Sequence, residues 1–401
     1  MSSDGEPWPA VSQREVSWRP TLPADLVPRS VRERHSGPYL AAVVSPIAAR
    51  TPSLDAATAT LADEASREIA RFDAQLGGEI APFATVLLRS ESASSSQIEQ
   101  LTAGAKAIAV AELGDGANKN AASVLGNVRA MRAALDLADD LNPSTILAMH
   151  AALLDEVEPT IAGRWRTDQV WIGGDTYGPH GAAFIPPVAD EVPALIDDLV
   201  AFARREDVPV LTLAAVSHAQ FETIHPFPDG NGRTGRALIH ALLRRQELTR
   251  AVTVPVSAGL LSGIDDYFAA LTAYRDGDPA PIVSALANGA LAAVVNAREL
   301  VAELHEVRAR WDDVVSARRD AAAWRVADLL LRQPVLDAAT IAREVGVTPG
   351  NALRALEPLL AAGVVTEFTG RARHRLWQAA EVLTAVDAFA TRAGRRQAPR
   401  P

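Results

Sequence analysis

Apolar side chains recur at helical spacing along most of this 401-residue chain. The segment 211–224 places Ala214 and Ile224 on one face, as an amphipathic helix does. The segments 58–76 and 101–155 show the same periodicity, and the second is broken by turn-forming residues into successive helices. The chain is therefore predicted to be mainly helical.

The segment 282–295 is the most apolar run of the chain. It is shorter than a membrane span requires, and Ser284 and Asn288 interrupt it. We therefore expect a buried core helix and no membrane association.

Two short apolar runs, 170–172 and 183–187, enclose a turn-rich stretch at 173–181. Short apolar runs on either side of a Gly-rich loop predict a β-hairpin. From spacing alone, a purely structural hairpin and one whose edge binds an added strand are equally acceptable.

The segment 313–390 has the pattern of a separate module. Its predicted elements are a helix at 338–345, a turn at Gly346, a helix at 348–362 and strands at 364–368 and 374–377. This order resembles a winged-helix domain.

Arg371, Arg373 and Arg375 make the turn between the strands basic, which suits contacts with DNA phosphates. A protein-interaction or dimerisation module, giving a homodimer, is the equally weighted alternative.

Composition narrows the possible functions. The net charge of −10 argues against a protein that coats nucleic acid, and the absence of cysteine excludes disulfides, thiol catalysis and cysteine–zinc sites. Asp4 and Glu6 stand where a secretion signal needs basic and then apolar residues. We expect a cytoplasmic protein, and the preference for Ala and Arg indicates a GC-rich bacterial genome.

The candidate chemistry is concentrated in the twelve residues 225–236, with the sequence HPFPDGNGRTGR, between two predicted helices. Pro226 and Pro228 prevent the first helix from continuing, while Gly230 and Gly232 allow backbone N–H groups to approach a ligand. The second helix is predicted to begin near residue 233, so that its positive end faces this loop. The arrangement is typical of a phosphate site.

The charged residues of this segment fit a polyphosphate. Arg233 and Arg236 lie on one face of the first helical turn, where an anion would offset their unfavourable position. Asp229 is a hard oxygen ligand suited to Mg²⁺ bound together with phosphates. His225 can accept a proton near neutral pH. Together they indicate transfer of a phosphate-linked group to a hydroxyl.

These residues allow two other interpretations. Gly230, Gly232 and Gly235 also spell a dinucleotide-binding fingerprint, although a helix precedes them where that motif requires a strand. A set of metal ligands at helical spacing is the second alternative, although Pro226 and Pro228 would break the helix that aligns them. The members of that set are His218, Glu222, His225 and Asp229.

Every fixed position of residues 225–236 matches HxFx(D/E)GNGRxxR, so the segment resembles the signature of the Fic family. The resemblance implies a protein adenylyltransferase that moves AMP from Mg-ATP to a Ser, Thr or Tyr of a protein, including itself. It implies that His225 is the catalytic base and that Asp229 binds Mg²⁺. The implied nucleotide and phosphate contacts are Phe227, Gly230, Asn231, Gly232, Arg233, Arg236 and, beside the adenine, Tyr267. The resemblance also implies that the hairpin at 170–187 is a flap that binds the target segment.

The segment around Ser95 and Glu99 has two interpretations. Ser96 and Glu99 fit a capping box, which predicts that a helix begins there. The spacing of Ser95 and Glu99 also resembles the (S/T)xxxE(G/N) pattern of the inhibitory helix of Fic proteins, although Gln100 replaces Gly or Asn. By resemblance, Glu99 would pair with Arg236 in place of the γ-phosphate.

The expected architecture is an all-α Fic core with a small hairpin flap, followed by the winged-helix-like α+β domain. The expected ranges are an extended or disordered arm at 1–37, a helical region with the inhibitory helix at 38–110, the Fic core at 111–312, the winged-helix-like domain at 313–390 and a tail at 391–401. The functional alternatives are removal of AMP by the same site and a DNA-binding regulator whose core senses nucleotide.

Overall fold

The computed structural model describes residues 7–18, 28–77, 80–116 and 118–394. The chain forms two compact units, and both are mainly helical. The first unit comprises 1–63, 133–246 and 265–285, and the second comprises 64–132, 247–264 and 286–401. Neither unit is continuous in sequence, whereas the ranges expected from the sequence were consecutive.

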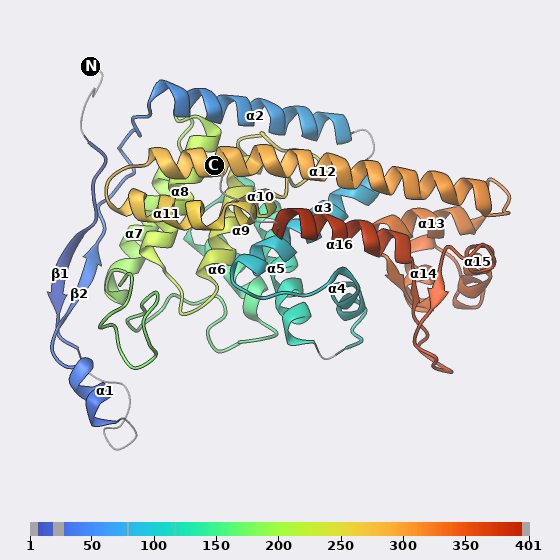
Figure 1. Cartoon of the computed structure of the whole chain (residues 1–401), viewed down its shortest axis with the longest axis horizontal. Coiled ribbons are helices and arrows are strands. Elements are labelled where there is room, and N and C mark those ends of the chain that lie inside the picture. The colour runs from blue at the N-terminus through green and yellow to red at the C-terminus, as the bar shows by residue number, and fades with distance from the viewer. Residues whose placement is uncertain (1–6, 19–27, 78–79, 117, 395–401) are drawn as a thin grey trace, which may run out of the picture. The chain divides into compact units, whose positions relative to one another are not determined.

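The first unit contains the 225–236 segment. Its elements are β1 (Ser12–Val16), α1 (Arg29–Arg34), β2 (Tyr39–Val43), η1 (Ala138–Asp140), α6 (Pro143–Leu154), η2 (Ala189–Glu191), α7 (Val192–Ala203), α8 (Val210–Ile224), α9 (Asn231–Arg245) and α11 (Ile264–Arg275). Helix α8 is buried from Leu211 to Ile224 and packs between α7 and α9 (Figure 1). The predicted helix over 211–224 is confirmed.

Helices α8 and α9 approach closely at Gly235. A Cβ atom at this position would lie 2.9 Å from Glu222 Oε1 and 2.9 Å from Phe221 Cδ1, closer than side-chain atoms normally pack. Glycine therefore lets α9 lie against the end of α8, which carries the loop between them. Both ends of the 225–230 loop are fixed by this helix pair.

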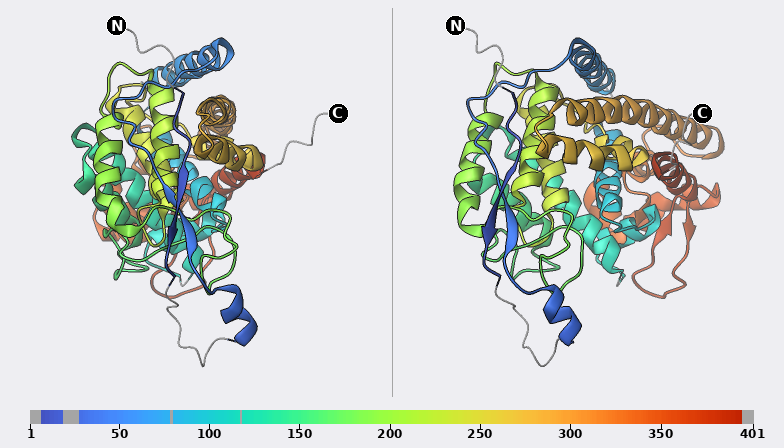
Figure 2. Two further views of the ribbon diagram at one scale, coloured as in Figure 1. Left: turned by 90° about the vertical axis from the view of Figure 1, so that its left-hand side faces the viewer. Right: turned by 60° about the vertical axis from the view of Figure 1, so that its left-hand side comes forward.

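Part of the N-terminal arm, which was expected to be extended or disordered, forms a β-strand. Strand β1 pairs with β2 in antiparallel register, with Ser12 opposite Val43 and Val16 opposite Tyr39. The two strands run side by side next to α7 and α8 (Figure 2), and the Val11 N–H donates to the Arg275 carbonyl of α11 over 2.7 Å. Part of the predicted arm is thus an edge strand of the first unit.

The second unit contains the candidate inhibitory segment and the C-terminal module. Its elements are α3 (Ile80–Ile98), α4 (Ala105–Glu112), α10 (Val256–Ser262), α13 (Ala322–Arg332), β3 (Val335–Leu336), α14 (Ala338–Val345), α15 (Pro349–Ala361), β4 (Thr366–Glu367), β5 (Trp377–Gln378) and α16 (Ala380–Gly394). Helices α2 (Ala56–Leu76), α5 (Lys119–Asp136) and α12 (Ala280–Val314) contribute residues to both units.

The predicted order of elements within 313–390 is present. Helices α14 and α15 follow the predicted boundaries, and the strands form a three-stranded antiparallel sheet in the order β3-β5-β4. Strand β5 begins at Trp377, later than expected, because residues 370–376 form the turn before it.

The apolar run 282–295 belongs to α12, which is much longer than the run itself. The sequence argument that this segment is too short to cross a membrane is therefore wrong on length. By length and composition alone α12 would suffice for a span, but 50% of its most apolar window is buried inside the protein. Burial of this kind is what a core helix shows.

Helix α3 contradicts the predicted helix start at Ser96. The helix begins at Ile80 and ends at Ile98, so Ser95 and Ser96 lie in its last turn and Glu99 follows it. Asn127 of α5 is buried and donates to the Ser92 carbonyl (2.9 Å) and to Ser96 Oγ (3.3 Å). Tertiary packing has therefore overridden the local capping pattern.

Gln100 ends α3 in the left-handed conformation, with φ of 61°. The Leu101 N–H donates to the Ser96 carbonyl and the Gln100 N–H to the Gln97 carbonyl, which is the Schellman arrangement. That arrangement favours Gly or Asn at this position, the residues of the Fic inhibitory pattern. Gln100 therefore adopts this left-handed conformation at an energetic cost.

Replacing Gln100 with glycine is expected to raise the free energy of unfolding by about 0.5–1 kcal/mol, because glycine adopts positive φ without strain. Urea unfolding followed by circular dichroism measures the change. Gln97→Gly is the matched control inside α3, where the same substitution should cost about 1 kcal/mol. Equal destabilisation by both variants would contradict the argument.

Candidate active site

His225 closes α8 in a left-handed conformation, with φ of 50° and ψ of 62°. This conformation is uncommon for a residue with a side chain, so neighbouring groups must stabilise it. Arg166, which is 3% exposed, donates from Nε to the His225 carbonyl over 2.8 Å, and its backbone N–H donates to the Pro226 carbonyl over 2.9 Å. Arg166 therefore holds the turn that presents His225.

Arg166 also binds the base of the hairpin. Its guanidinium donates to the Pro187 carbonyl and to the Asp168 carbonyl, the second over 3.2 Å. Burial lowers the pKa of Arg166 to about 10, which leaves the group charged at neutral pH. One buried cation thus joins the hairpin to the 225–230 loop through backbone carbonyls.

The His225 ring lies among charged groups. Its Nδ1 is 4.0 Å from Glu222 Oε2. Burial lowers the pKa of His225 to about 3, and the positive charges of Arg166 and Arg275 act in the same direction. The imidazole is therefore neutral at pH 7 and retains a lone pair that can accept a proton.

Asn231 fixes the shape of the loop. Its Oδ1 accepts a hydrogen bond from the Phe227 N–H, and its Nδ2 donates to the Phe227 carbonyl, each over 2.8 Å. The Phe227 ring is fully buried, stacked on His150 at a centroid distance of 3.6 Å and near Trp165 at 4.9 Å. Both residues were expected to contact nucleotide, and the structure places their side chains in the support of the loop.

His150 was not identified from the sequence, because a single histidine in an apolar helix carries no recognisable pattern. The Gly163 N–H donates to His150 Nδ1 over 3.0 Å, so the ring proton is on Nε2, which donates to the Asp229 carbonyl over 3.0 Å. Burial lowers the pKa of His150 to about 4, so this neutral tautomer persists at pH 7. It anchors the loop at Asp229.

Gly230 and the first turn of α9 form the candidate phosphate cradle. Gly230 has φ of 77°, and a Cβ there would lie 2.8 Å from Leu153 Cδ2, so a side chain at this position would be strained. No side chain caps the helix, and Gly232 follows within its first turn. The free N–H groups of this turn therefore face the loop, as the sequence predicted.

The predicted charged residues occupy this helix end. Arg233 donates from one Nη to Asp229 Oδ2 over 3.1 Å. The Asp229 side chain is 56% exposed, so its carboxylate is accessible to a hard cation bound with phosphates. Arg236 is 1% exposed, and its charge helps to lower the pKa of His218, after burial. The structure thus pairs Arg233 with Asp229 and places Arg236 close enough to His218 to act on its pKa.

The alternative metal-binding set does not form. Over the part of the chain that the structure describes, no group of three or more His, Asp or Glu side chains is arranged to hold a metal ion. His218 is buried and its Nε2 lies 2.7 Å from the Tyr267 hydroxyl, while burial lowers its pKa to about 3. The dinucleotide alternative also fails, because α8 and not a strand precedes Gly230.

Tyr267 is 2% exposed, and its hydroxyl is engaged with His218. Its neighbour Phe268 is 49% exposed and lies 5.3 Å away between ring centroids. Tyr267, expected beside the adenine, is therefore a core aromatic here, and Phe268 presents the open aromatic surface.

The predicted hairpin is present in a minimal form. Ile172 and Phe184 form one antiparallel bridge, and the Ala42 N–H of β2 donates to the Ile185 carbonyl over 2.9 Å. The Arg275 guanidinium lies 3.9 Å from the centre of the Phe184 ring. Strand β2 of the chain itself is thus hydrogen-bonded to one arm of the hairpin. The cation beside this arm, Arg275, also lowers the pKa of His225.

Arg166 and Arg275 were not identified from the sequence. Both lie outside the 225–236 segment and affect His225 from other parts of the fold. Arg166 lies in the sequence that leads into the predicted hairpin, and no recognisable pattern marks it.

 The last residue of the motif is Arg236, and Arg275 follows it by 39 positions with nothing in its local sequence to mark it. Only the fold brings these side chains to His225.

In the C-terminal module, two of the three arginines in the turn between β4 and β5 are engaged by carboxylates. Arg371 pairs with Asp115, and Arg375 pairs with Glu367 over 3.1 Å. These pairs offset part of the positive charge on which the DNA-binding interpretation depended.

Comparison with known proteins finds a family match over the same segment that forms the site. Residues 140–243 match the model of the Fic/DOC family, a range that contains α8, the 225–230 loop and most of α9. This part of the chain is therefore similar to the Fic/DOC family.

Its relatives are proteins named as adenylyltransferases. Protein adenylyltransferase fic-1 of Caenorhabditis elegans is 30% identical over 159 residues, which is 39% of this chain and 28% of that protein. The probable protein adenylyltransferase aq_aa38 of Aquifex aeolicus is 48% identical over 64 residues, 16% of this chain and 20% of that protein. The similarity thus spans less than a third of the length of either relative.

A crystal structure of a Fic family protein from Desulfovibrio desulfuricans G20 has the same general fold. It aligns with 82% of this chain and 98% of its own, with a TM-score of 0.53 and 22% sequence identity. This likeness concerns the fold alone.

Proposed function

We propose that this chain is a protein adenylyltransferase that moves AMP from Mg-ATP to a hydroxyl group of a protein, including its own. The proposal is carried by one observation, the composition of the 225–236 segment. A neutral His225 and an exposed Asp229 carboxylate lie in its loop, and the uncapped N-terminus of α9 with two arginines follows directly. The names of its relatives favour transfer of AMP over its removal.

The charged residues have complementary roles in the proposal. The N–H groups of the first turn of α9, together with Arg233 and Arg236, bind the phosphates of the nucleotide and then the leaving diphosphate. Asp229 would hold Mg²⁺, which when bound neutralises phosphate charge. These groups orient the α-phosphate and stabilise the negative charge that develops during transfer.

His225 accepts the proton of the acceptor hydroxyl in the proposed reaction. The acceptor oxygen forms a bond to the α-phosphorus while the bond from that phosphorus to the bridging oxygen breaks, and diphosphate leaves. Although burial keeps the pKa of His225 near 3 in the free protein, an adjacent polyphosphate would raise it toward the working pH, because negative charge favours the protonated ring. Proton transfer is therefore promoted once nucleotide is bound.

Incubation with ATP labelled at either the α- or the γ-phosphate tests the proposal. We expect label from the α-phosphate, and none from the γ-phosphate, to become covalently attached to protein. Transfer of the γ-label would instead indicate a kinase, and absence of both labels from the chain and from an added cell lysate would contradict the proposal.

We further propose that Ser95 and Glu99 belong to an inhibitory segment. Support comes from the match to the (S/T)xxxE pattern, from the continuous helix α3 that reaches Ile98, and from the left-handed Gln100 that completes its end. By resemblance, the Glu99 carboxylate competes with the γ-phosphate for Arg236 and leaves ATP in an unproductive pose.

Glu99→Gly is expected to increase self-labelling about tenfold, since loss of one charge-assisted pair of roughly 1.4 kcal/mol changes an equilibrium by that factor. Glu99→Gln is the matched variant, because it removes the charge while keeping the shape of the side chain, and should also increase labelling. Unchanged rates in both variants would leave Glu99 without an inhibitory role.

A further inference from the structure

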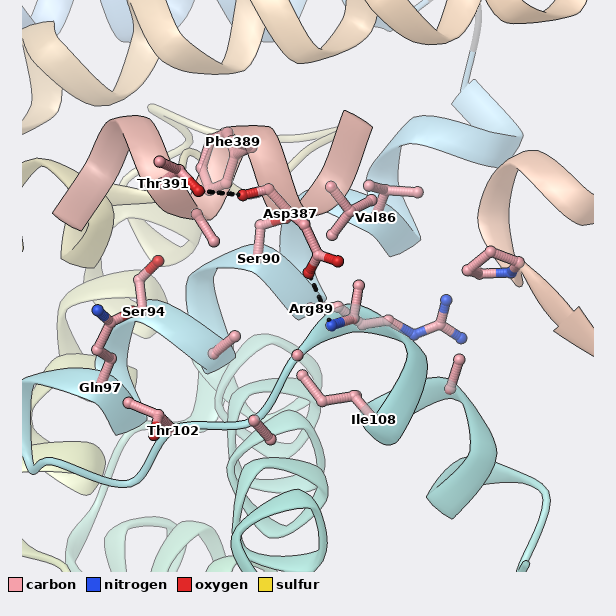
Figure 3. A pocket seen from close by; sticks show the side chains of 18 of the residues that line it. Val86, Arg89, Ser90, Ser94, Gln97, Thr102, Ile108, Asp387, Phe389 and Thr391 are labelled. Carbon is pink, nitrogen blue, oxygen red and sulfur yellow. Dashed lines mark hydrogen bonds between the residues drawn. The ribbon is translucent and has the colours of Figure 1, made fainter. Parts of the chain in front are cut away.

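A cavity of about 650 Å³ lies within the second unit, beside the candidate inhibitory helix α3. One wall is a single face of α3 that includes Val86, Ser90 and Gln97. The other walls come from the 102–105 turn with α4, from the end of α13 and from α16 (Figure 3). A volume of this size falls within the range of sites that enclose small organic ligands.

The other face of α3 is firmly packed. Glu91 is fully buried, and its carboxylate accepts hydrogen bonds from the Ser257 N–H (2.8 Å) and the Ser257 hydroxyl (2.5 Å) of α10. Asn127 holds the backbone at Ser92 and the hydroxyl of Ser96. The helix is therefore supported by protein on one side and borders open space on the other.

The charged groups in the wall already have protein partners. Arg89 donates from Nε to Glu112 over 3.0 Å and also binds the Arg332 carbonyl, while Arg332 itself pairs with Glu344 over 2.8 Å. Asp387 accepts a hydrogen bond from the Ala105 N–H over 3.0 Å. A charged ligand would lose hydration here without gaining an available counter-charge, so the wall favours a neutral one.

The remaining polar groups are uncharged. The Ser90 side chain is buried, and within the described ranges its hydroxyl has no hydrogen-bond partner. Ser94 and Gln97 extend from α3 on the side of the cavity nearest Thr391, and Arg89 extends toward the opposite end (Figure 3). Apolar side chains, including Ile108 and Phe389, supply much of the rest of the wall.

We propose that this cavity binds an uncharged, mainly apolar small molecule with a hydroxyl or carbonyl group, and that the bound molecule holds α3 in its helical form. The helix ends next to Glu99, so occupation of the cavity strengthens inhibition and lowers AMP transfer. The binding itself is independent of the activity, whereas its regulatory effect rests on the proposed adenylyltransferase function and on the inhibitory role of Glu99. Ligand binding to the folded helix must stabilise it, because the two equilibria are linked.

N-phenyl-1-naphthylamine, a neutral fluorescent molecule, is the probe for binding to the full chain. We expect saturable fluorescence enhancement, with the dissociation constant raised at least tenfold by Ala93→Leu in α3 or by Ala390→Leu in α16, each of which fills part of the cavity. Ala292→Leu, an exposed site on α12 outside this cavity, is the matched control and should bind as the unmodified chain does. Circular dichroism confirms folding, and two filling variants on separate helices protect the test against the failure of one.

Hydrogen exchange provides the readout for α3 without any enzyme assay. The probe should slow amide exchange in residues 86–98 of the unmodified chain and leave the filled variants unchanged. It should also reduce self-labelling about threefold, but not in Glu99→Gly. No saturable binding, equal binding by all variants, or unchanged exchange in α3 would overturn the proposal; a chain that binds the probe and protects α3 but transfers no AMP would instead contradict the proposed function alone.

Discussion

Replacing His225 with alanine is expected to lower the rate of AMP transfer by about 10³-fold, the typical contribution of a general base. The variant loses the neutral ring that accepts the hydroxyl proton, while Asp229, Arg233 and the N-terminus of α9 remain to bind nucleotide. The loss should therefore appear in kcat, with little change in nucleotide affinity. Measurement of α-phosphate label transfer, together with calorimetric titration of ATP, separates the two effects.

His374→Ala is the matched control for His225→Ala. His374 is an exposed histidine in the turn between β4 and β5, so its loss should leave the rate unchanged. Label transfer by His225→Ala at the rate of the unmodified chain would rule out His225 as the base.

Arg166→Met is expected to reduce the free energy of unfolding by about 3 kcal/mol. The methionine side chain keeps much of the volume but leaves the carbonyls of His225, Pro187 and Asp168 without the donor that they share, and an unsatisfied buried polar group costs about 1–3 kcal/mol. The left-handed turn at His225 would relax, so kcat should fall while KM for ATP changes little. Urea unfolding and steady-state kinetics measure both effects.

Arg164→Met makes the same substitution at an exposed position and should change the unfolding free energy by less than about 0.5 kcal/mol. Arg166→Lys should recover only part of the lost rate, since an ammonium group lacks the planar fork that reaches several carbonyls at once. Equal stability of Arg164→Met and Arg166→Met would contradict the positioning role of Arg166.

Periodicity and turn chemistry predicted the parts of the fold that local sequence controls. The helix over 211–224 and the break after it follow from apolar spacing and from two prolines, and the site follows because its charged residues are close in sequence. The cradle at Gly230 was predictable for the same reason: glycine there permits a backbone conformation that other residues resist.

Long-range packing could not be predicted in this way. Ser96 and Glu99 spell a helix start, yet burial of Asn127 against Ser96 and of Glu91 against Ser257 makes this segment the end of a helix. Arg166 and His150 support the 225–230 loop from distant positions, so no local pattern marks them. The edge strand β1 was hidden because its side chains are mostly exposed and show no alternation.

The carboxylate partners of Arg371 and Arg375 have a consequence for any DNA duplex that binds at the turn between β4 and β5. Each arginine would have to exchange Asp115 or Glu367 for a phosphate, and the released carboxylate would then attract a cation from solution. Cations set free by the duplex would thus be partly taken up by the protein, and the entropy gain that usually drives such complexes would be reduced. Affinity at this surface would therefore depend less strongly on ionic strength than it would with unpaired arginines.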